Sequence, residues 1–172
     1  MLALARGLEF STVGSRRAAA EWVPFLRTMP LFAGVSHRHL CRLVRCARFR
    51  RFAPHSTVTR AGEEGRAFYL IIDGEVQLLA NGHVTHLVEG DFFGEMSIID
   101  GAPQVATVVT VTEMLAMQLE RGPFVRMIGS EPSVSLGIMK ELVSTVRGLE
   151  DGYGRRELQG LTHAAVGHAP YG

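Results

Sequence analysis

The sequence predicts a mainly β protein, an antiparallel β-roll (jelly-roll-like) with flanking helices, and three observations support this fold class. First, short β-rich segments separated by turn residues run from Arg48 to Glu120. Second, Asp73-Gly74 and Asn81-Gly82 are typical of hairpin turns. Third, no helical pattern of about 10 to 15 residues alternates with the strands, which argues against a parallel sheet. About six to eight strands at this spacing favour a rolled or closed sheet.

The residues before the strands are expected to be helical in part. Residues 1–28 are expected to form an N-terminal arm, partly helical or disordered, in which Pro24 interrupts a helix from Ser15 to Trp22. Ser36 is a good N-cap for a second, short helix, because apolar residues then recur at helical spacing.

The helical period returns after the strands. A short helix from Phe124 to Ile128 is expected to end at Gly129, and Pro132 suits the first turn of a longer helix. That second helix carries an apolar stripe made of Leu136, Met139, Val143, Val146 and Leu149. The chain therefore divides into the arm, a domain over residues 29–150 and a flexible tail over residues 151–172.

Composition excludes several classes of function. The 172 residues are 47% apolar and contain 18 Lys and Arg against 17 Asp and Glu, so a core is expected, but net charge indicates neither nucleic acid nor a membrane as partner. No signal peptide or membrane span is recognised, which predicts a soluble cytoplasmic protein.

Cys41 and Cys46 are expected to be free, buried thiols. The seven histidines are scattered and no catalytic motif occurs, so neither a metal site nor an enzyme is expected.

The segment FGEMSIIDGAPQVATV, residues 93–108, is the best candidate for a binding site. Gly94 allows a close approach of the backbone to a ligand, since it has no Cβ. The residues from Glu95 to Ile98 can form one helical turn, whose first N–H groups suit a phosphate. The Glu95 carboxylate can accept a hydrogen bond from a sugar hydroxyl, and the Ser97 hydroxyl can add a donor.

This segment resembles the phosphate-binding cassette of cyclic nucleotide-binding domains, which occur in regulatory subunits of cAMP-dependent protein kinase, in catabolite activator proteins and in nucleotide-gated channels. The family pattern is roughly F-G-E-[LM]-[AS]-L, a loop, then P-R-A-A-[TS]-V, and residues 93–98 and 103–108 follow it in order. The resemblance extends over about residues 30–150, through PLFAGVSHRHLCRLV, the G-E-V after Asp73 and the EGDFFGE run.

The resemblance implies a role for each residue of the cassette. Gly94 and the amides of Met96 and Ser97 would hold the cyclic phosphate, and Glu95 would hold the ribose 2′-hydroxyl. The ligand would be a cyclic nucleotide, cAMP rather than cGMP, and no other cofactor is implied. In this family the final helix, here residues 132–150, closes over the base, and Tyr153 is a candidate aromatic cap.

Two positions depart from the family pattern: the phosphate-binding arginine falls on Gln104, and the small residue after it on Val105. A neutral hydrogen bond contributes about 0.5–1.5 kcal/mol, whereas losing one partner of a buried charged pair costs roughly 2–5 kcal/mol. Affinity is therefore expected to fall on the order of 30-fold to several-thousand-fold.

The surrounding charge also disfavours an anion. Residues 67–120 contain eight acidic residues and no Lys or Arg, which leaves His83, His86, Arg60 and Arg66 as candidate cations.

Two functional hypotheses stay open. The first is a non-enzymatic regulatory or sensor module that binds a cyclic nucleotide weakly and signals through its C-terminal helix. The second is a degenerate domain that binds no nucleotide and acts as a scaffold for an unknown protein partner or for self-association. In the second case Gly94 is only a turn residue, Glu95 caps backbone amides of the empty cassette, and Gln104 is a surface loop residue.

Overall fold

The computed structural model describes residues 16–140, 142–144 and 146–147, and the chain divides into two compact units at Val134 and Ser135. Among the described residues of the first unit, three short helical elements precede the strands: α2 (Arg16–Leu26), η1 (Pro30–Phe32) and α3 (His37–Cys46). The strands are β1 (Arg48–Phe52), β2 (Thr57–Thr59), β3 (Ala67–Asp73), β4 (Val76–Ala80), β5 (His83–Leu87), β6 (Phe92–Phe93), β7 (Thr107–Thr110) and β8 (Met114–Glu120). Helix α4 (Glu95–Asp100) lies between β6 and β7, and α5 (Arg121–Ser130) follows β8.

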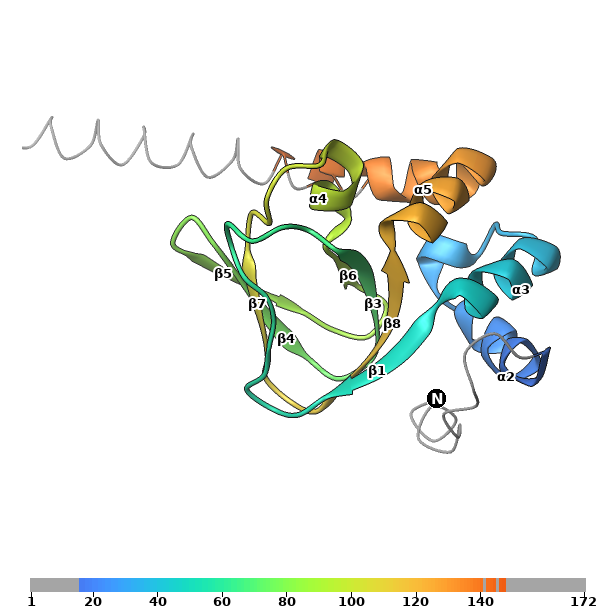
Figure 1. Cartoon of the computed structure of the whole chain (residues 1–172), viewed down its shortest axis with the longest axis horizontal. Helices are drawn as coiled ribbons and strands as arrows, with labels where there is room; N and C mark the ends of the chain where they lie inside the picture. Colours follow the sequence, from blue (N-terminus) through green and yellow to red (C-terminus); the bar gives the residue numbers. More distant parts are fainter. Residues whose placement is uncertain (1–15, 141, 145, 148–172) are drawn as a thin grey trace, which may run out of the picture. The chain divides into compact units, whose positions relative to one another are not determined.

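The eight strands confirm the rolled antiparallel fold (Figure 1). They form two four-stranded sheets, one in the order β1-β8-β3-β6 and the other in the order β2-β7-β4-β5. Every pair of neighbouring strands is antiparallel. Strand β1 is an edge strand, and its arginines are exposed.

Strand β3 is buried on both faces because it separates two apolar layers. Tyr69 packs inside the roll against Phe93, with ring centroids 5.0 Å apart. Phe68 faces the helices and stacks on Phe124 of α5 at 4.8 Å. The methionines Met114 and Met117 of β8 are fully buried and belong to the core.

Of the two hairpin predictions, one is confirmed and one is wrong. Asn81 and Gly82 both have positive φ and join β4 to β5, with Ala80 opposite His83. Asp73-Gly74 does not form a hairpin, because β3 and β4 belong to different sheets. A Cβ on Gly74 would lie 2.4 Å from the Glu113 carbonyl oxygen, so glycine is needed there where the chain crosses between the sheets.

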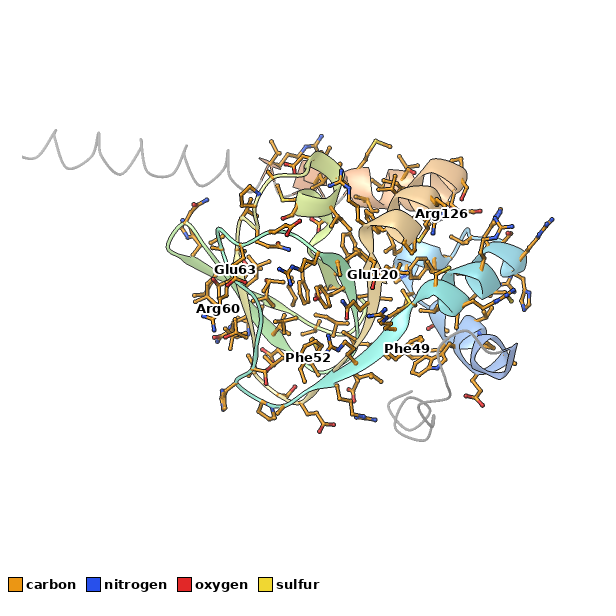
Figure 2. The ribbon with its side chains drawn as sticks, in the orientation of Figure 1. Phe49, Phe52, Arg60, Glu63, Glu120 and Arg126 are labelled. Atoms are coloured by element: carbon orange, nitrogen blue, oxygen red, sulfur yellow. The ribbon has the colours of Figure 1, made fainter. Side chains whose placement is uncertain are left out.

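The N-terminal helix differs from the prediction. Pro24 lies inside α2 and does not end it, although its ring removes one backbone donor. Trp22 of this helix is buried and stacks on Phe49 of β1 at 4.1 Å (Phe49 is labelled in Figure 2). Trp22 therefore anchors this part of the expected arm to the roll.

Other boundaries also differ from the expectations. Ser36 caps α3 as predicted, by accepting from the His39 N–H. Helix α5 continues past Gly129 to Ser130, and a further helix covers residues 132–140 and continues through 142–144 and 146–147. The division between the compact units lies at Val134 and Ser135, and the expected domain boundary at residue 150 lies outside the described residues. The tail over residues 151–172, with Tyr153, and Leu149 of the stripe lie outside the described residues.

The prediction of two buried thiols is wrong. Cys41 and Cys46 are both free, but Cys41 is only partly buried and Cys46 is exposed. Both lie on α3, whose buried face is formed by Leu40, Leu43 and Val44, so the thiols occupy other positions around the helix.

Candidate functional site

The candidate site begins at a left-handed turn that opens α4. Gly94 is the N-cap of this helix with φ 85°, and a Cβ there would lie 2.5 Å from the Ala67 carbonyl oxygen of β3. Glycine is therefore required both by the backbone conformation and by the close contact. Because Gly94 has no side chain, no side-chain cap occupies the first amide donors of α4. The predicted helical turn from Glu95 is confirmed, and anion binding at this turn stays a prediction.

The first residues of α4 have different environments. Glu95 is the first helical residue and is partly buried, whereas Met96 is 38% exposed. Ser97 is 3% exposed, and within the described part of the chain its buried hydroxyl has no hydrogen-bond partner. An unpaired buried hydroxyl is costly, so Ser97 Oγ is a group that a ligand could satisfy.

Gly65, in the loop between β2 and β3, covers Ser97. A Cβ built on Gly65 would lie 2.2 Å from the Ser97 Cβ and 3.3 Å from the Gln104 Nε2. Sequence reasoning missed this residue. The available signal was the second glycine of R-A-G-E-E-G-R, residues 60–66. Only the rolled sheet shows that this loop contacts the cassette.

Gln104 is buried, with 8% of its surface exposed, so the alternative interpretation of it as a surface loop residue is wrong. Its backbone is held by two hydrogen bonds: Gln104 N donates to the Glu63 carbonyl oxygen at 2.7 Å, and Gly62 N donates to the Gln104 carbonyl oxygen at 2.8 Å. The structure thus places the Gln104 side chain beside Ser97 and Gly65, at the position where the family pattern has an arginine. Val105, by contrast, is 55% exposed.

The arginines in or beside this loop are already paired with acids. Arg60 Nε lies 3.8 Å from a Glu63 oxygen, and Arg66 Nε lies 4.0 Å from a Glu64 oxygen. Figure 2 shows Arg60 beside Glu63. The two arginine side chains are 64% and 84% exposed, so solvent screens them and they stabilise a buried anion only weakly.

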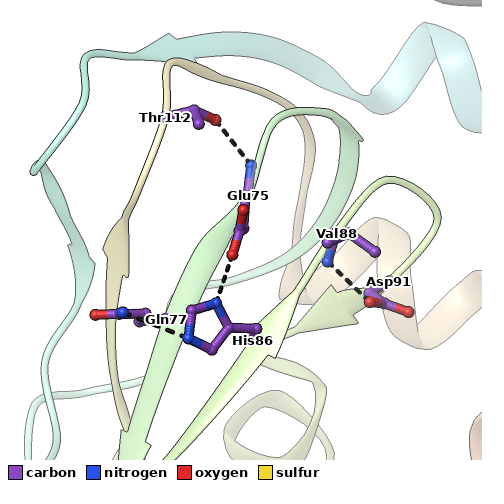
Figure 3. A network of polar contacts seen from close by, with 6 residues as sticks. All are labelled: Glu75, Gln77, His86, Val88, Asp91 and Thr112. Atoms are coloured by element: carbon purple, nitrogen blue, oxygen red, sulfur yellow. Dashed lines mark hydrogen bonds and ion pairs between the residues drawn. The ribbon is translucent and has the colours of Figure 1, made fainter.

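The histidine candidate His86 is engaged elsewhere. On strand β5 it forms a contact with the Glu75 carboxylate, and its other ring nitrogen lies 3.5 Å from the Gln77 amide (Figure 3). Glu75 N donates to the Thr112 hydroxyl at 3.0 Å, which ties this cluster to the loop before β8. The contacts of His86 therefore lie at the edge of the second sheet, on strands β4 and β5 and the residues next to them.

Figure 3 also shows the turn that leads into the cassette. The Asp91 carboxylate accepts a hydrogen bond from Val88 N at 2.9 Å, and Asp91 N donates to the Val88 carbonyl oxygen. These bonds fix the chain immediately before β6 and so help to position the Gly94 turn.

Within the described residues, no group of three or more His, Cys, Asp or Glu side chains could hold a metal ion. In the same part of the chain, no helix combines the length and the hydropathy that a membrane span needs.

Comparison with known proteins gives a family match at this site. The model described as "Cyclic nucleotide-binding domain" matches residues 49–131, which include α4, Gly65 and Gln104. A cAMP-dependent protein kinase regulatory subunit of Colletotrichum orbiculare is 30% identical over 131 residues, which cover 74% of this chain and 33% of that protein. The chain thus spans about a third of the length of this relative.

Solved structures show the same fold. The catabolite activator protein of Thermus thermophilus aligns with a TM-score of 0.63 and 25% identity, covering 77% of this chain and 63% of that chain. The regulatory subunit of a cAMP-independent protein kinase A from Trypanosoma brucei aligns with a TM-score of 0.59 and 25% identity, covering 72% of this chain and 50% of that chain.

Proposed function

Because residues 49–131 of this chain belong to the cyclic nucleotide-binding domain family, we propose that it is a non-enzymatic regulatory module that binds a cyclic nucleotide weakly. The ligand's cyclic phosphate would lie on the first amides of α4, between Gly94 and Ser97, and Glu95 would accept a bond from the ribose. Binding would be passed on through the helix that starts at residue 132.

The observation that carries this proposal is the buried hydroxyl of Ser97 at the glycine-capped start of α4, which has no hydrogen-bond partner among the residues that the structure describes. Leaving a buried hydroxyl unpaired costs about 1–3 kcal/mol. A phosphate oxygen at this turn would pair the hydroxyl and would also accept from the uncapped amide donors of α4. The site is thus chemically incomplete without an acceptor.

Gln104 explains why we propose weak binding. It occupies a buried position beside Ser97 and offers an amide in place of a positive charge. The exposed Arg60 and Arg66 do not replace that charge, because each is paired with an acid of its own loop. One structural relative is the regulatory subunit of a protein kinase A that is described as cAMP-independent.

We propose cAMP as the preferred nucleotide over cGMP because the sequence relative is named for cAMP. A ligand can shift the equilibrium between two arrangements of the C-terminal helix only by as much as its binding free energy differs between them. A weakly bound nucleotide therefore shifts this helix only at high ligand concentration.

Calorimetric titration with cAMP and with cGMP tests the proposal on the full chain and on Gln104→Arg. We expect the arginine variant to bind cAMP about 30-fold to several-thousand-fold more tightly than the unmodified chain. Gln77→Arg, which adds the same charge on strand β4, is the matched control and should leave affinity unchanged.

Two outcomes would contradict the proposal. If Gln104→Arg also fails to bind, the cassette does not form a nucleotide site. If the unmodified chain binds as tightly as the arginine variant, Gln104 does not limit affinity and our account of the missing cation is wrong.

A scaffold function is the second candidate, and one observation favours it. Leu136, Met139, Val143 and Val146 follow each other at spacings of three, four and three residues, and each side chain is between 50% and 54% exposed. Such a 3-4-3 spacing is typical of a helix that packs on another helix. Ligand-independent association through this stripe, together with silent titrations, would support the scaffold over the sensor.

A further inference from the structure

A pocket of about 260 Å³ lies between helices α3 and α5, on elements that do not belong to the cassette. Its apolar lining comes from Val35, Leu43 and Met127, and its exposed lining from Arg42, Cys46 and Arg126. Arg126 is labelled on α5 in Figure 2. The volume is below the roughly 300–1,000 Å³ of sites for drug-sized ligands, so it suits a single apolar side chain.

The charge around the pocket is positive. Neither α3, with the sequence HRHLCRLVRC, nor α5, with RGPFVRMIGS, contains an acidic residue. Within the described residues, Arg42 and Arg126 form no ion pair with a carboxylate. Two exposed arginines therefore line an apolar pocket, and neither is paired with a carboxylate in the part of the chain that the structure describes.

One acid also lines the pocket, and it is already engaged. The buried carboxylate of Glu131 contacts the His39 ring, which comes from α3. Even with Glu131 ionised and His39 neutral, the two arginines leave the lining with a net charge of +1 (two minus one). A negatively charged partner is thus favoured over a neutral or cationic one.

We propose that this pocket is a docking site for an acidic peptide segment of a partner protein. One apolar side chain of the segment enters between Leu43 and Met127, and carboxylates on either side of it pair with Arg42 and Arg126. Such an arrangement places a buried apolar anchor at the centre of the contact and charged pairs at its rim.

The surface around the pocket fits a peptide better than an anionic membrane. Membrane insertion requires protruding apolar side chains, and the exposed positions described on α3 are histidine, arginine and cysteine. The exposed large apolar residue on α5 is Val125 alone. The apolar surface is recessed into the pocket, where a side chain can reach it and a bilayer cannot.

Nuclear magnetic resonance titration of the full chain tests the proposal with defined probes. Three acetylated and amidated pentapeptides carry two glutamates on each side of a central leucine, methionine or phenylalanine. We expect at least one of them to shift the backbone amides of α3 and α5 and to protect the exposed Cys46 thiol from alkylation in a Cys41→Ser background. Binding should weaken as salt is raised, because the charged pairs are exposed.

Matched variants separate the two parts of the contact. Arg42→Glu and Arg126→Glu should each weaken binding about fivefold, while Arg27→Glu, an exposed position after α2, should not. A peptide with a central serine should bind about tenfold or more weakly than the leucine peptide, since the apolar anchor is lost. Ser130→Trp, at an exposed position of the lining, should block the pocket.

Each contrary result overturns the proposal. Absence of binding by all three peptides at low salt would show that the pocket is not a docking site for acidic segments. If the serine peptide binds as tightly as the leucine peptide, binding comes from charge attraction alone and no apolar side chain enters the pocket. Binding to vesicles of phosphatidylcholine and phosphatidylserine, lost in Arg42→Glu, would assign this surface to a membrane.

Discussion

Gly65 lies directly against Ser97, because a Cβ on Gly65 would come within 2.2 Å of the Ser97 Cβ. This contact connects the loop between β2 and β3 to the first turn of α4. The two residues are 32 positions apart in the sequence. The loop is held there by the backbone bonds between Gln104, Glu63 and Gly62. The cassette is therefore shaped from two sides, and both sides can be tested separately.

Gly65→Ala should disturb the cassette. The added methyl group meets a Cβ atom, which cannot rotate away, so the loop must shift. We expect a loss of about 1–3 kcal/mol in unfolding free energy, measured by urea denaturation, and weaker cAMP binding when the substitution is made in the Gln104→Arg background. Gly129→Ala is the control, because its added Cβ would meet no atom within 4 Å apart from its chain neighbours and the backbone of its own helix. Equal stability of the two variants would contradict the contact.

Ser97→Ala should affect stability and binding in opposite directions. Removing a buried hydroxyl that has no partner in the described structure should leave the unliganded protein equally stable or stabilise it by up to about 1–3 kcal/mol. The same change should weaken cAMP binding in the Gln104→Arg background, since the ligand loses a donor.

Thr110→Val provides the contrast for Ser97. Thr110 is also buried, but its hydroxyl donates to the Ala53 carbonyl oxygen at 2.7 Å and accepts from Ser56 N at 2.8 Å. Its loss leaves partners unpaired and should cost about 1–3 kcal/mol in urea denaturation. A Ser97→Ala variant that is destabilised as much as Thr110→Val would show that Ser97 is an ordinary structural residue.

The apolar stripe of the C-terminal helix leads to a prediction about assembly. Val143→Glu introduces a charge in the middle of the stripe formed by Leu136, Met139, Val143 and Val146. If the scaffold function holds, sedimentation velocity should show the unmodified chain associating without nucleotide and the variant remaining monomeric. Ser144→Glu adds the same charge one residue later and is the control. A monomeric unmodified chain at all concentrations would remove the scaffold candidate.

The sequence was sufficient for the fold and for the turn at Gly94 that opens α4, because both depend on local signals. Asn81-Gly82 fixes a hairpin by its own backbone preference, and Gly94 marks a left-handed turn. Asp73-Gly74 failed as a hairpin signal because the glycine serves a contact with Glu113, which is remote in sequence. Gly65 was missed for the same reason: its role exists only once the sheet has rolled the loop onto α4.

Burial was the other quantity that local patterns did not determine. Gln104 is polar and lies in a loop, yet it is buried because the backbone of residues 62–64 pairs with the chain there. Cys46 is exposed although cysteine is usually buried, because Leu40, Leu43 and Val44 already form the buried face of α3. In both cases tertiary packing outweighed the preference of the residue type.

Tyr69 makes the stability of the roll sensitive to high pH. Burial inside the roll raises the pKa of its phenol above the usual value, and the nearby Arg50 guanidinium opposes this only in part. The pKa of Tyr69 is higher in the folded state than in the unfolded state. At pH values between these two pKa values, the folded state therefore binds more protons than the unfolded state. Its contribution to the free energy of unfolding is therefore complete below the unfolded pKa of about 10 and is lost as the pH rises through the folded pKa.

Tyr69→Phe should remove this pH dependence, because phenylalanine keeps the ring that stacks on Phe93 and has no proton to lose. We expect urea denaturation to give similar unfolding free energies for the two proteins at pH 8, and a smaller fall for the variant between pH 8 and pH 11. The difference between the two proteins isolates Tyr69 from every other group that titrates in this range. Parallel profiles for both proteins would show that the Tyr69 phenol titrates alike in the folded and unfolded states, against the effect of burial.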